Sequence, residues 1–336
     1  MIAEWERQRC VLISFPHEGT DWAKGDLTAA LSPFIRIAQA IAYKEAVYII
    51  CQSKEKIMPL FCSTRNLTFI EIPTNDTWIR DYGYFSIEAE GETRLLDFTF
   101  DGWGGKFAAH LDNRVNRTLH QKGYMGTTPL DEIDFVLEGG SIESNGEGTL
   151  LTTSQCLCNP NRNGGLKKEE VEHRLKRYLG AKQVLWLDHG SLEGDDTDSH
   201  IDTLARFTDA QTIAYVKCDD REDLHYRTLA EMEAELKSFT QPNGEPYRLV
   251  PLPLCRAVYH HDGTRLPATY TNFLITNDAL LFPTYDDEKN DTLAEEAFRL
   301  LFPDREMIPI NCLKLIEEGG SLHCSTMQVA CEERQR

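Results

Sequence analysis

The stretch Tyr84–Phe98, YFSIEAEGETRLLDF, carries the pattern that decides the fold. Two apolar runs flank the turn residues Glu90-Gly91-Glu92, which is the pattern of a β-hairpin. The same pattern recurs in three further stretches: Gly140–Thr152, Thr203–Val216 and Asn272–Thr284. The sequence therefore predicts a repeated hairpin.

Helical patterns, each with a following strand, lie between the hairpins. We expect helices at Leu27–Tyr43, Lys167–Leu179, Arg221–Phe239 and Thr292–Phe302, followed by strands at Ala46–Cys51, Val184–Leu187, Tyr247–Leu254 and Met307–Ile310. Gly180 is placed to end the second helix. The unit of hairpin, helix and strand recurs roughly every sixty residues. We therefore expect an α/β fold in which residues 1–336 form one catalytic domain, a closed propeller-like ring of modules around a central site.

The composition is that of a globular protein, with 41% apolar and 26% charged residues in 336. No stretch approaches the ~20 apolar residues that cross a bilayer. The start, Met1–Arg7, lacks the basic and apolar regions of a secretory signal, so we expect a cytoplasmic enzyme. Ten cysteines are then expected to be reduced thiols, and none forms a CxxC pair that would indicate structural zinc.

The formal net charge is −19, which argues against nucleic acid or an anionic membrane as a partner. An acidic cleft suits a small cationic substrate, although the charge of the whole chain also has a simpler explanation in solubility. The sequence leaves open whether the chain forms a homo-oligomer.

Polar residues stand at corresponding places in the modules. Asp81, Glu138 and His200–Asp202 precede the first three hairpins, Asn272 opens the fourth, and Cys324 ends the last module. In a ring, each module would deliver one or two of these side chains to a common mouth.

Cys324 follows Gly319-Gly320-Ser321, where the backbone can bend to expose a nucleophilic thiol. The alternative is a small buried apolar residue. Its neighbour His323 would point to the opposite face of a strand, so we expect it to support packing or a hydrogen bond rather than to act as the base.

His200 and Asp202 are the candidate proton-handling pair. On a strand, both side chains would point to one side, with Ile201 facing the core. Histidine titrates near neutrality and can give a proton to a departing amine, then take one from water. The alternative is a helix N-cap, because Asp195–Ser199 is rich in capping residues.

Three other residues are candidates for binding a planar cation. Asp81 could accept paired hydrogen bonds while Trp78 forms a pocket wall, although an Arg-Asp pair beside a tryptophan also suits an ordinary packed turn. Glu138 is either another anionic contact to the substrate or a structural brace.

Together these residues fit chemistry on a guanidinium group. Carboxylates would hold its donors, a thiolate would attack the central carbon, and His200 would protonate the ammonia that leaves. A covalent thiouronium would form and be hydrolysed, and this scheme requires no metal or organic cofactor.

The chain resembles the agmatine deiminase family of guanidine-modifying enzymes, which is related to bacterial peptidyl-arginine deiminases. The resemblance rests on segments in the same order along the chain: Asn75–Asp81, Glu138–Ile142, Asn161–Asn163, His200–Asp202 and Gly320–Cys324. It implies a five-bladed, pseudo-fivefold α/β propeller of the pentein type, built of ββαβ modules. It also implies hydrolysis of agmatine to N-carbamoylputrescine and ammonia, in polyamine synthesis or agmatine catabolism.

By motif match, the resemblance makes Cys324 the nucleophile, His200 the acid/base, and Asp81 and Asp202 the guanidinium holders. Glu138 would be a further active-site carboxylate and Trp78 a pocket wall. From its charge and position, Asp196 is the candidate contact for the far amine of agmatine.

Two positions depart from the family pattern: Ser199 stands where glycine is common, and Tyr84 where proline is common. The competing interpretations are a deiminase of arginine or peptidyl-arginine, a non-catalytic polyamine- or guanidine-binding protein, and a Cys-His acyl hydrolase. The last is disfavoured because an acyl substrate gives no reason for several carboxylates. The acidic run Asp195–Asp198 favours a dicationic substrate over one that carries a carboxylate.

Overall fold

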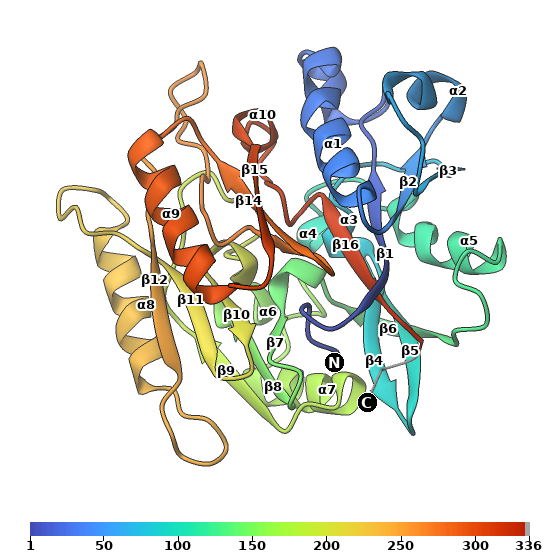
Figure 1. Ribbon diagram of the computed structural model, residues 1–336. Coiled ribbons are helices and arrows are strands. Elements are labelled where there is room, and N and C mark those ends of the chain that lie inside the picture. The colour runs from blue at the N-terminus through green and yellow to red at the C-terminus, as the bar shows by residue number, and fades with distance from the viewer. Residues whose placement is uncertain (333–336) are drawn as a thin grey trace.

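The structure, a computed structural model, describes residues 1–332 (Figure 1). Within this range the strands form five sheets, four of three strands and one of four. In each sheet a central strand pairs antiparallel with one neighbour and parallel with the other. The result is an α/β fold with mixed sheets.

The sheets differ mainly in which part of the chain builds them. The strands, sheet by sheet, are β16 (Thr326–Ala330), β1 (Gln8–Ser14), β2 (Ala46–Cys51) and β3 (Leu67–Glu71); β4 (Phe85–Ala89), β5 (Glu92–Thr99) and β6 (Leu130–Val136); β7 (Glu143–Ser144), β8 (Thr149–Thr153) and β9 (Gln183–Leu187); β10 (Ala205–Asp209), β11 (Thr212–Lys217) and β12 (Arg248–Pro253); β13 (Leu274–Ile275), β14 (Ala279–Thr284) and β15 (Glu306–Asn311). The first sheet contains strands from both ends of the described chain, because β16 pairs antiparallel with β1.

All four predicted hairpins are confirmed, as the pairs β4–β5, β7–β8, β10–β11 and β13–β14. In the first, Phe85 pairs with Leu96 and Ala89 with Glu92. The two residues between the strands, Glu90 and Gly91, both have positive φ, 55° and 84°. That is the turn whose twist matches a two-residue hairpin.

The four predicted helices are also confirmed, as α1 (Leu27–Ala42), α7 (Lys168–Leu179), α8 (Tyr226–Ser238) and α9 (Glu288–Leu301). Gly180 ends α7 in the left-handed conformation, with φ 69°. The predicted start of α8 at Arg221 is wrong by five residues. Asp220 and Asp223 there accept hydrogen bonds from the backbone N–H groups two residues on, which stabilises turns rather than a helix.

Shorter helices occupy connections for which the sequence pattern gave no prediction: α2 (Lys54–Ile57), α3 (Ile79–Tyr82), α4 (Gly102–Gly105), α5 (Val115–Gln121), α6 (Ser154–Leu157) and α10 (Leu313–Ile316). No helix in residues 1–332 has the length and apolar character needed to cross a membrane.

The long helices pack between sheets. α1 contacts both β2 and β15, and α9 contacts β12, β14 and β15, so each covers the junction of two sheets (Figure 1). The short segments that precede the hairpins contact one another: α3 touches the 3₁₀ turn Gly139–Ser141, which in turn touches the 3₁₀ turn Ile201–Thr203. This meeting of the pre-hairpin segments builds the site.

Candidate active site

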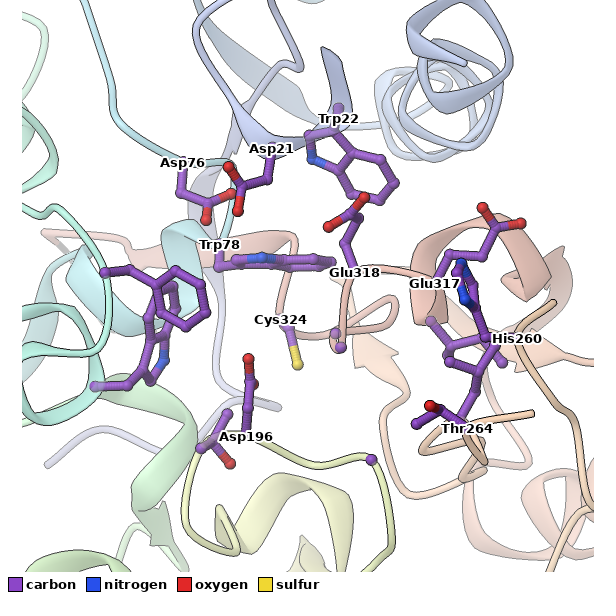
Figure 2. A pocket seen from close by; sticks show the side chains of 18 of the residues that line it. Asp21, Trp22, Asp76, Trp78, Asp196, His260, Thr264, Glu317, Glu318 and Cys324 are labelled. Atoms are coloured by element: carbon purple, nitrogen blue, oxygen red, sulfur yellow. The ribbon is translucent and has the colours of Figure 1, made fainter. Parts of the chain in front are cut away.

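Cys324 lies in the turn between α10 and β16, and its sulfur points into a cavity of ≈ 330 Å³ (Figure 2). Its Sγ lies 3.4 Å from Asn272 Oδ1 and 3.7 Å from Asp202 Oδ2. Burial and the nearby charges of Asp202 and Asp81 raise the pKa of this thiol well above its ordinary value. The site without a bound cation therefore holds a neutral thiol, which donates to Asn272.

His200 does not lie on a strand, so the predicted strand over His200–Asp202 is wrong. Asp195 accepts hydrogen bonds from the backbone N–H groups of Thr197 (3.0 Å) and Ser199 (2.7 Å), which fold this segment into tight turns. A 3₁₀ turn, Ile201–Thr203, follows, and the His200 side chain makes no capping hydrogen bond to it.

The environment of His200 favours its charged form. The side chain is fully buried, and both ring nitrogens lack a hydrogen-bond partner within residues 1–332. Nδ1 lies 3.6 Å from Asp81 Oδ1. Burial opposes charging, but Asp81, Cys156 and Glu138 outweigh it and raise the pKa of His200 well above its ordinary value. A buried imidazolium with unpaired N–H groups can act as a general acid.

Asp81 is a buried carboxylate held by two donors. Gly140 N donates to Oδ1 and Trp103 Nε1 donates to Oδ2, both at 2.9 Å. Burial raises its pKa, against the opposing effect of the His200 charge. The sequence analysis missed Trp103. The feature of the sequence that could have indicated Trp103 is the glycine-rich run Gly102–Gly105. Within this run, Trp103 itself adopts a left-handed conformation with φ 58°.

Asp202 is fully buried, and His323 Nδ1 donates to its Oδ2 at 2.8 Å. The expectation that His323 supports a hydrogen bond is confirmed. Burial opposes ionisation of Asp202, but the hydrogen bond and charge of His323, together with His200, hold its pKa below the usual range. The other oxygen, Oδ1, is buried without a partner within residues 1–332. Such an acceptor is costly unless a ligand satisfies it.

Gly140 allows these groups to converge. A Cβ at this position would lie 2.7 Å from His200 Nδ1, 2.9 Å from Asp81 Oδ1 and 3.1 Å from Asp202 Oδ2. Three polar atoms of the site therefore surround one point where only glycine fits.

Glu138 is buried behind this group. Its Oε1 accepts from Arg162 Nε at 2.7 Å, and both side chains are fully buried. Its Oε2 has no partner within residues 1–332. Glu138 also belongs to a cluster with His200 and Cys156 in which one ligand-type atom of each residue lies within 4.8 Å of the others. Glu138, His200 and Asp202 are not among the residues that line the cavity, whereas Asp81, Trp78, Asp196 and Cys324 are.

Aromatic side chains form one wall of the cavity. The Trp78 ring lies beside Cys324 and contacts Trp22, with ring centroids 5.8 Å apart (Figure 2). A Cβ at Gly320 would come within 2.4 Å of the Trp78 ring, so glycine there allows the ring to lie against the turn that carries Cys324. No motif marked Trp22 as a site residue, because it lies far along the chain from Trp78, the ring that it contacts.

Carboxylates gather at the mouth of the cavity. Asp21 and Asp76 point toward one another, and Asp196 lies across the cavity from Trp78 (Figure 2). Burial and neighbouring acids raise the pKa of Asp76 to about 7 and that of Asp196 to about 6. Of these residues, the sequence analysis singled out Asp196 alone.

The cations near the mouth are already paired. Arg265 is the one lysine or arginine among the lining residues of the described chain, and both of its terminal nitrogens donate to Asp223, at 3.0 and 2.8 Å. Lys106 pairs with Asp198 Oδ1 at 2.9 Å. The cavity therefore presents carboxylates without free counter-charges.

Two clusters in residues 1–332 bring together atoms of the kinds that bind metals: Glu138, Cys156 and His200, and Glu4, Glu143 and His323. In both, an arginine already pairs with the carboxylates: Arg162 with Glu138, and Arg206 with Glu4 and Glu143.

Comparison with known proteins gives a consistent result. The family model of the Porphyromonas-type peptidyl-arginine deiminases matches residues 1–330. The agmatine deiminase of Medicago truncatula is 33% identical over 360 residues, covering 98% of this chain and 95% of the plant protein.

Solved structures agree closely. A cysteine-to-serine variant of the agmatine deiminase of C. jejuni with substrate bound has a TM-score of 0.93 and 39% identity, covering 99% of this chain and 96% of the other. A Porphyromonas gingivalis protein provisionally named an arginine deiminase has a TM-score of 0.91 and 48% identity, with 97% of each chain covered. A Pseudomonas aeruginosa DDAH, 11% identical with a TM-score of 0.55, shares the fold alone. This chain belongs to the Porphyromonas-type peptidyl-arginine deiminase family.

Proposed function

We propose that the protein is an agmatine deiminase, which hydrolyses agmatine to N-carbamoylputrescine and ammonia. The observation that carries this proposal is the charge of the cavity: Asp21, Asp76 and Asp196 line it, while Arg265 is held by Asp223. Agmatine has a guanidinium at one end and an ammonium at the other, so both ends suit such a wall. The agmatine deiminases similar to this chain add support.

The guanidinium lies between Asp81 and Asp202, near the point that Gly140 leaves open. Its donors satisfy the unpartnered Oδ1 of Asp202, and Trp78 covers its planar face. Burial and repulsion from Asp195 raise the pKa of Asp196, and the charge of the far ammonium, from which Asp196 accepts, offsets this effect.

Substrate binding activates the nucleophile. Burial and the carboxylates of Asp202 and Asp81 raise the pKa of Cys324, and a bound guanidinium offsets the charge of the two carboxylates. The thiol then loses its proton to solvent, and the thiolate bonds to the guanidinium carbon. The imidazolium of His200 protonates one amino group, the C–N bond breaks, and ammonia leaves. A cationic S-alkylthiouronium and a neutral His200 remain.

Hydrolysis reverses the proton flow. His200 takes a proton from water as the oxygen bonds to the thiouronium carbon, the C–S bond breaks to restore the thiolate, and the adduct gives its extra proton to solvent. The carbamoyl product leaves. Glu138 is a buried anion beside His200 and stabilises the imidazolium. Arg162 fixes the orientation of the Glu138 carboxylate. The scheme uses no metal or organic cofactor.

We also propose that the five sheets close into a pseudo-fivefold α/β propeller that forms one catalytic domain over residues 1–336, of which 333–336 lie outside the described residues. The shared sheet topology supports this arrangement, as do helices that cover the junctions between sheets. The site residues then occupy the same place in successive blades, directly before each hairpin.

The nearest alternative is a deiminase of arginine or peptidyl-arginine, and the P. gingivalis neighbour gives it specific support. An α-carboxylate would require a cation near the mouth of the cavity, where Arg265 is already paired with Asp223. Ammonia release from agmatine, arginine and a blocked arginyl peptide tests the choice. We expect turnover of agmatine, its loss in Cys324→Ala, and wild-type rates in Cys62→Ala, whose thiol is exposed.

Preference for arginine or the peptide would keep the mechanism and overturn the substrate. Binding of agmatine without ammonia release from any compound would favour a non-catalytic guanidine-binding protein.

A further inference from the structure

Glu4 lies directly beneath the residues that hold the guanidinium in the proposed function. The first residues of the chain are fixed between two sheets: Ile2 N donates to Ser86 O in β4 at 2.9 Å, and Ser144 Oγ in β7 donates to Met1 O at 3.2 Å (Figure 1). This placement brings Glu4 to the imidazole of His323, the residue next to Cys324.

Four side chains converge on the Glu4 carboxylate. Oε1 accepts from Arg80 Nη1 at 2.9 Å and lies 2.8 Å from His323 Nε2. Oε2 accepts from Gln328 Nε2 at 3.0 Å and from Arg206 Nη2. Burial opposes ionisation, but Arg206, His323 and Arg80 together hold the pKa of Glu4 well below its ordinary value. Glu4 is therefore a fixed anion, with a side chain that is 16% exposed.

His323 bridges Glu4 and Asp202. Its Nε2 lies 2.8 Å from Glu4 and its Nδ1 lies 2.8 Å from Asp202, and its side chain is 1% exposed. An ionised carboxylate only accepts hydrogen bonds, so each ring nitrogen must carry a hydrogen. A neutral imidazole has one N–H and would leave a lone pair against a carboxylate. The geometry requires the imidazolium.

Charged groups surround His323. Arg80, Arg206 and His323 face the carboxylates of Glu4, Glu143 and Asp202 in this layer. Burial raises the pKa of Glu143 to about 7, so Glu4 and Asp202 are the anions that act on the ring. The Arg80 side chain also reaches the His323 carbonyl oxygen through Nε at 3.4 Å. Removal of the Glu4 carboxylate would leave His323 Nε2 without its anionic acceptor, and the imidazolium can then lose a proton, which the arginines cannot.

Asp202 links the charged groups around His323 to the nucleophile and the substrate. The oxygen that accepts from His323, Oδ2, is the one 3.7 Å from Cys324 Sγ, and the other is the unpartnered Oδ1. A charged His323 therefore orients Asp202 and favours its ionised form, which a guanidinium needs.

We infer that Glu4 is a positioning residue for the deimination: it holds His323 as an imidazolium, and through His323 it keeps Asp202 ionised and oriented toward the substrate. The inference rests on the proposed function for its kinetic consequences. Its structural part, the protonation of His323 by Glu4, stands apart from turnover.

The kinetic test compares Glu4→Gln with Glu143→Gln. Both remove a carboxylate that pairs with Arg206, but Glu143 bonds to Arg206 Nε and Phe207 N and makes no hydrogen bond to His323. We expect Glu4→Gln to lower kcat/KM for agmatine about tenfold, because Asp202 loses the charged partner that orients it and keeps it ionised. Glu143→Gln should keep kcat/KM near that of wild type.

The direct test is the ¹⁵N NMR signal of His323, assigned by its loss in His323→Asn. Wild type should show a hydrogen on both ring nitrogens of His323, and Glu4→Gln should show a hydrogen on one of them. Glu4→Asp keeps the charge but moves it away from the ring, so it should shift the ¹⁵N signal in the same direction as Glu4→Gln. It replaces Glu4→Gln in the test if that variant does not fold.

An unchanged His323 signal in these variants, or an equal loss of kcat/KM in Glu143→Gln, would overturn the role of Glu4. Absence of turnover in wild type would instead overturn the proposed function, and the NMR signal would still decide whether Glu4 sets the charge of His323.

Discussion

Trp103→Phe removes one hydrogen bond from Asp81 and little else. The indole Nε1 donates to Asp81 Oδ2 at 2.9 Å, and the ring packs edge-on against Phe100 and Phe107, with centroids 5.0 and 5.5 Å away. Phenylalanine keeps much of this packing but has no N–H. Asp81 would retain the bond from Gly140 N.

The magnitude follows from the type of bond. A buried hydrogen bond to a charged group contributes about 1.5–3 kcal/mol, which corresponds to about a ten- to hundredfold loss in kcat/KM. The direction in pH follows from the same bond, because the Trp103 N–H lowers the pKa of Asp81 and its loss raises that pKa further. The carboxylate that holds the cation then becomes protonated at a higher pH, so the acid limb of kcat/KM moves upward.

The assay is ammonia release from agmatine over a pH series, with Trp186→Phe as the matched control. Trp186 is also buried, and its indole donates to a carboxylate, Glu172, at 3.3 Å, but it does not line the cavity. Trp186→Phe should leave the kinetic constants near those of wild type. If Trp103→Phe kept both wild-type kcat/KM and the wild-type acid limb, Asp81 would not be a holder of the guanidinium.

Three further predictions follow from the same geometry. Gly320→Ala would place a Cβ 2.4 Å from the Trp78 ring, at a cost of about 1–3 kcal/mol, and should lower kcat/KM at least tenfold without loss of fold by circular dichroism; wild-type kinetics would show that the ring position is unimportant. Ser199→Gly should stabilise the protein by about 1 kcal/mol in thermal unfolding, because Ser199 has φ 67°, and an unchanged or lower midpoint would contradict this. Asp76 has a pKa of about 7, so it gains charge and binds a cation better as pH rises through that value; KM for agmatine should fall across this range, and Asp76→Asn should abolish that fall.

The repeated elements could be predicted from the sequence because their signals are local. Turn residues between apolar runs located all four hairpins, and 3.6-residue periodicity located the long helices. The polar positions before the hairpins followed from the same repeat. Ser199 marked a real feature too: its left-handed backbone explains why glycine is common there in the family that the chain resembles.

The rest depends on contacts between distant parts of the chain. The strand over His200–Asp202 was wrong because Asp195, through side-chain bonds to the backbone, stabilises turns that alternation cannot reveal. Trp103 and Glu4 could not be predicted as site residues because each contacts a residue far along the chain. Trp103 bonds to Asp81, 22 residues away, and Glu4 bonds to His323, 319 residues away. Residue type alone does not distinguish such side chains from ordinary core or surface residues.

The covalent step on Cys324 is the central claim, and trapping it is the most direct test. Wild type would be quenched in acid during turnover of agmatine and digested, and the peptide that carries Cys324 analysed by mass spectrometry. The account predicts an adduct on Cys324 with the mass of agmatine less ammonia, formed and lost at rates compatible with turnover. Turnover with that cysteine unmodified at every time point, or continued ammonia release by Cys324→Ala, would contradict it.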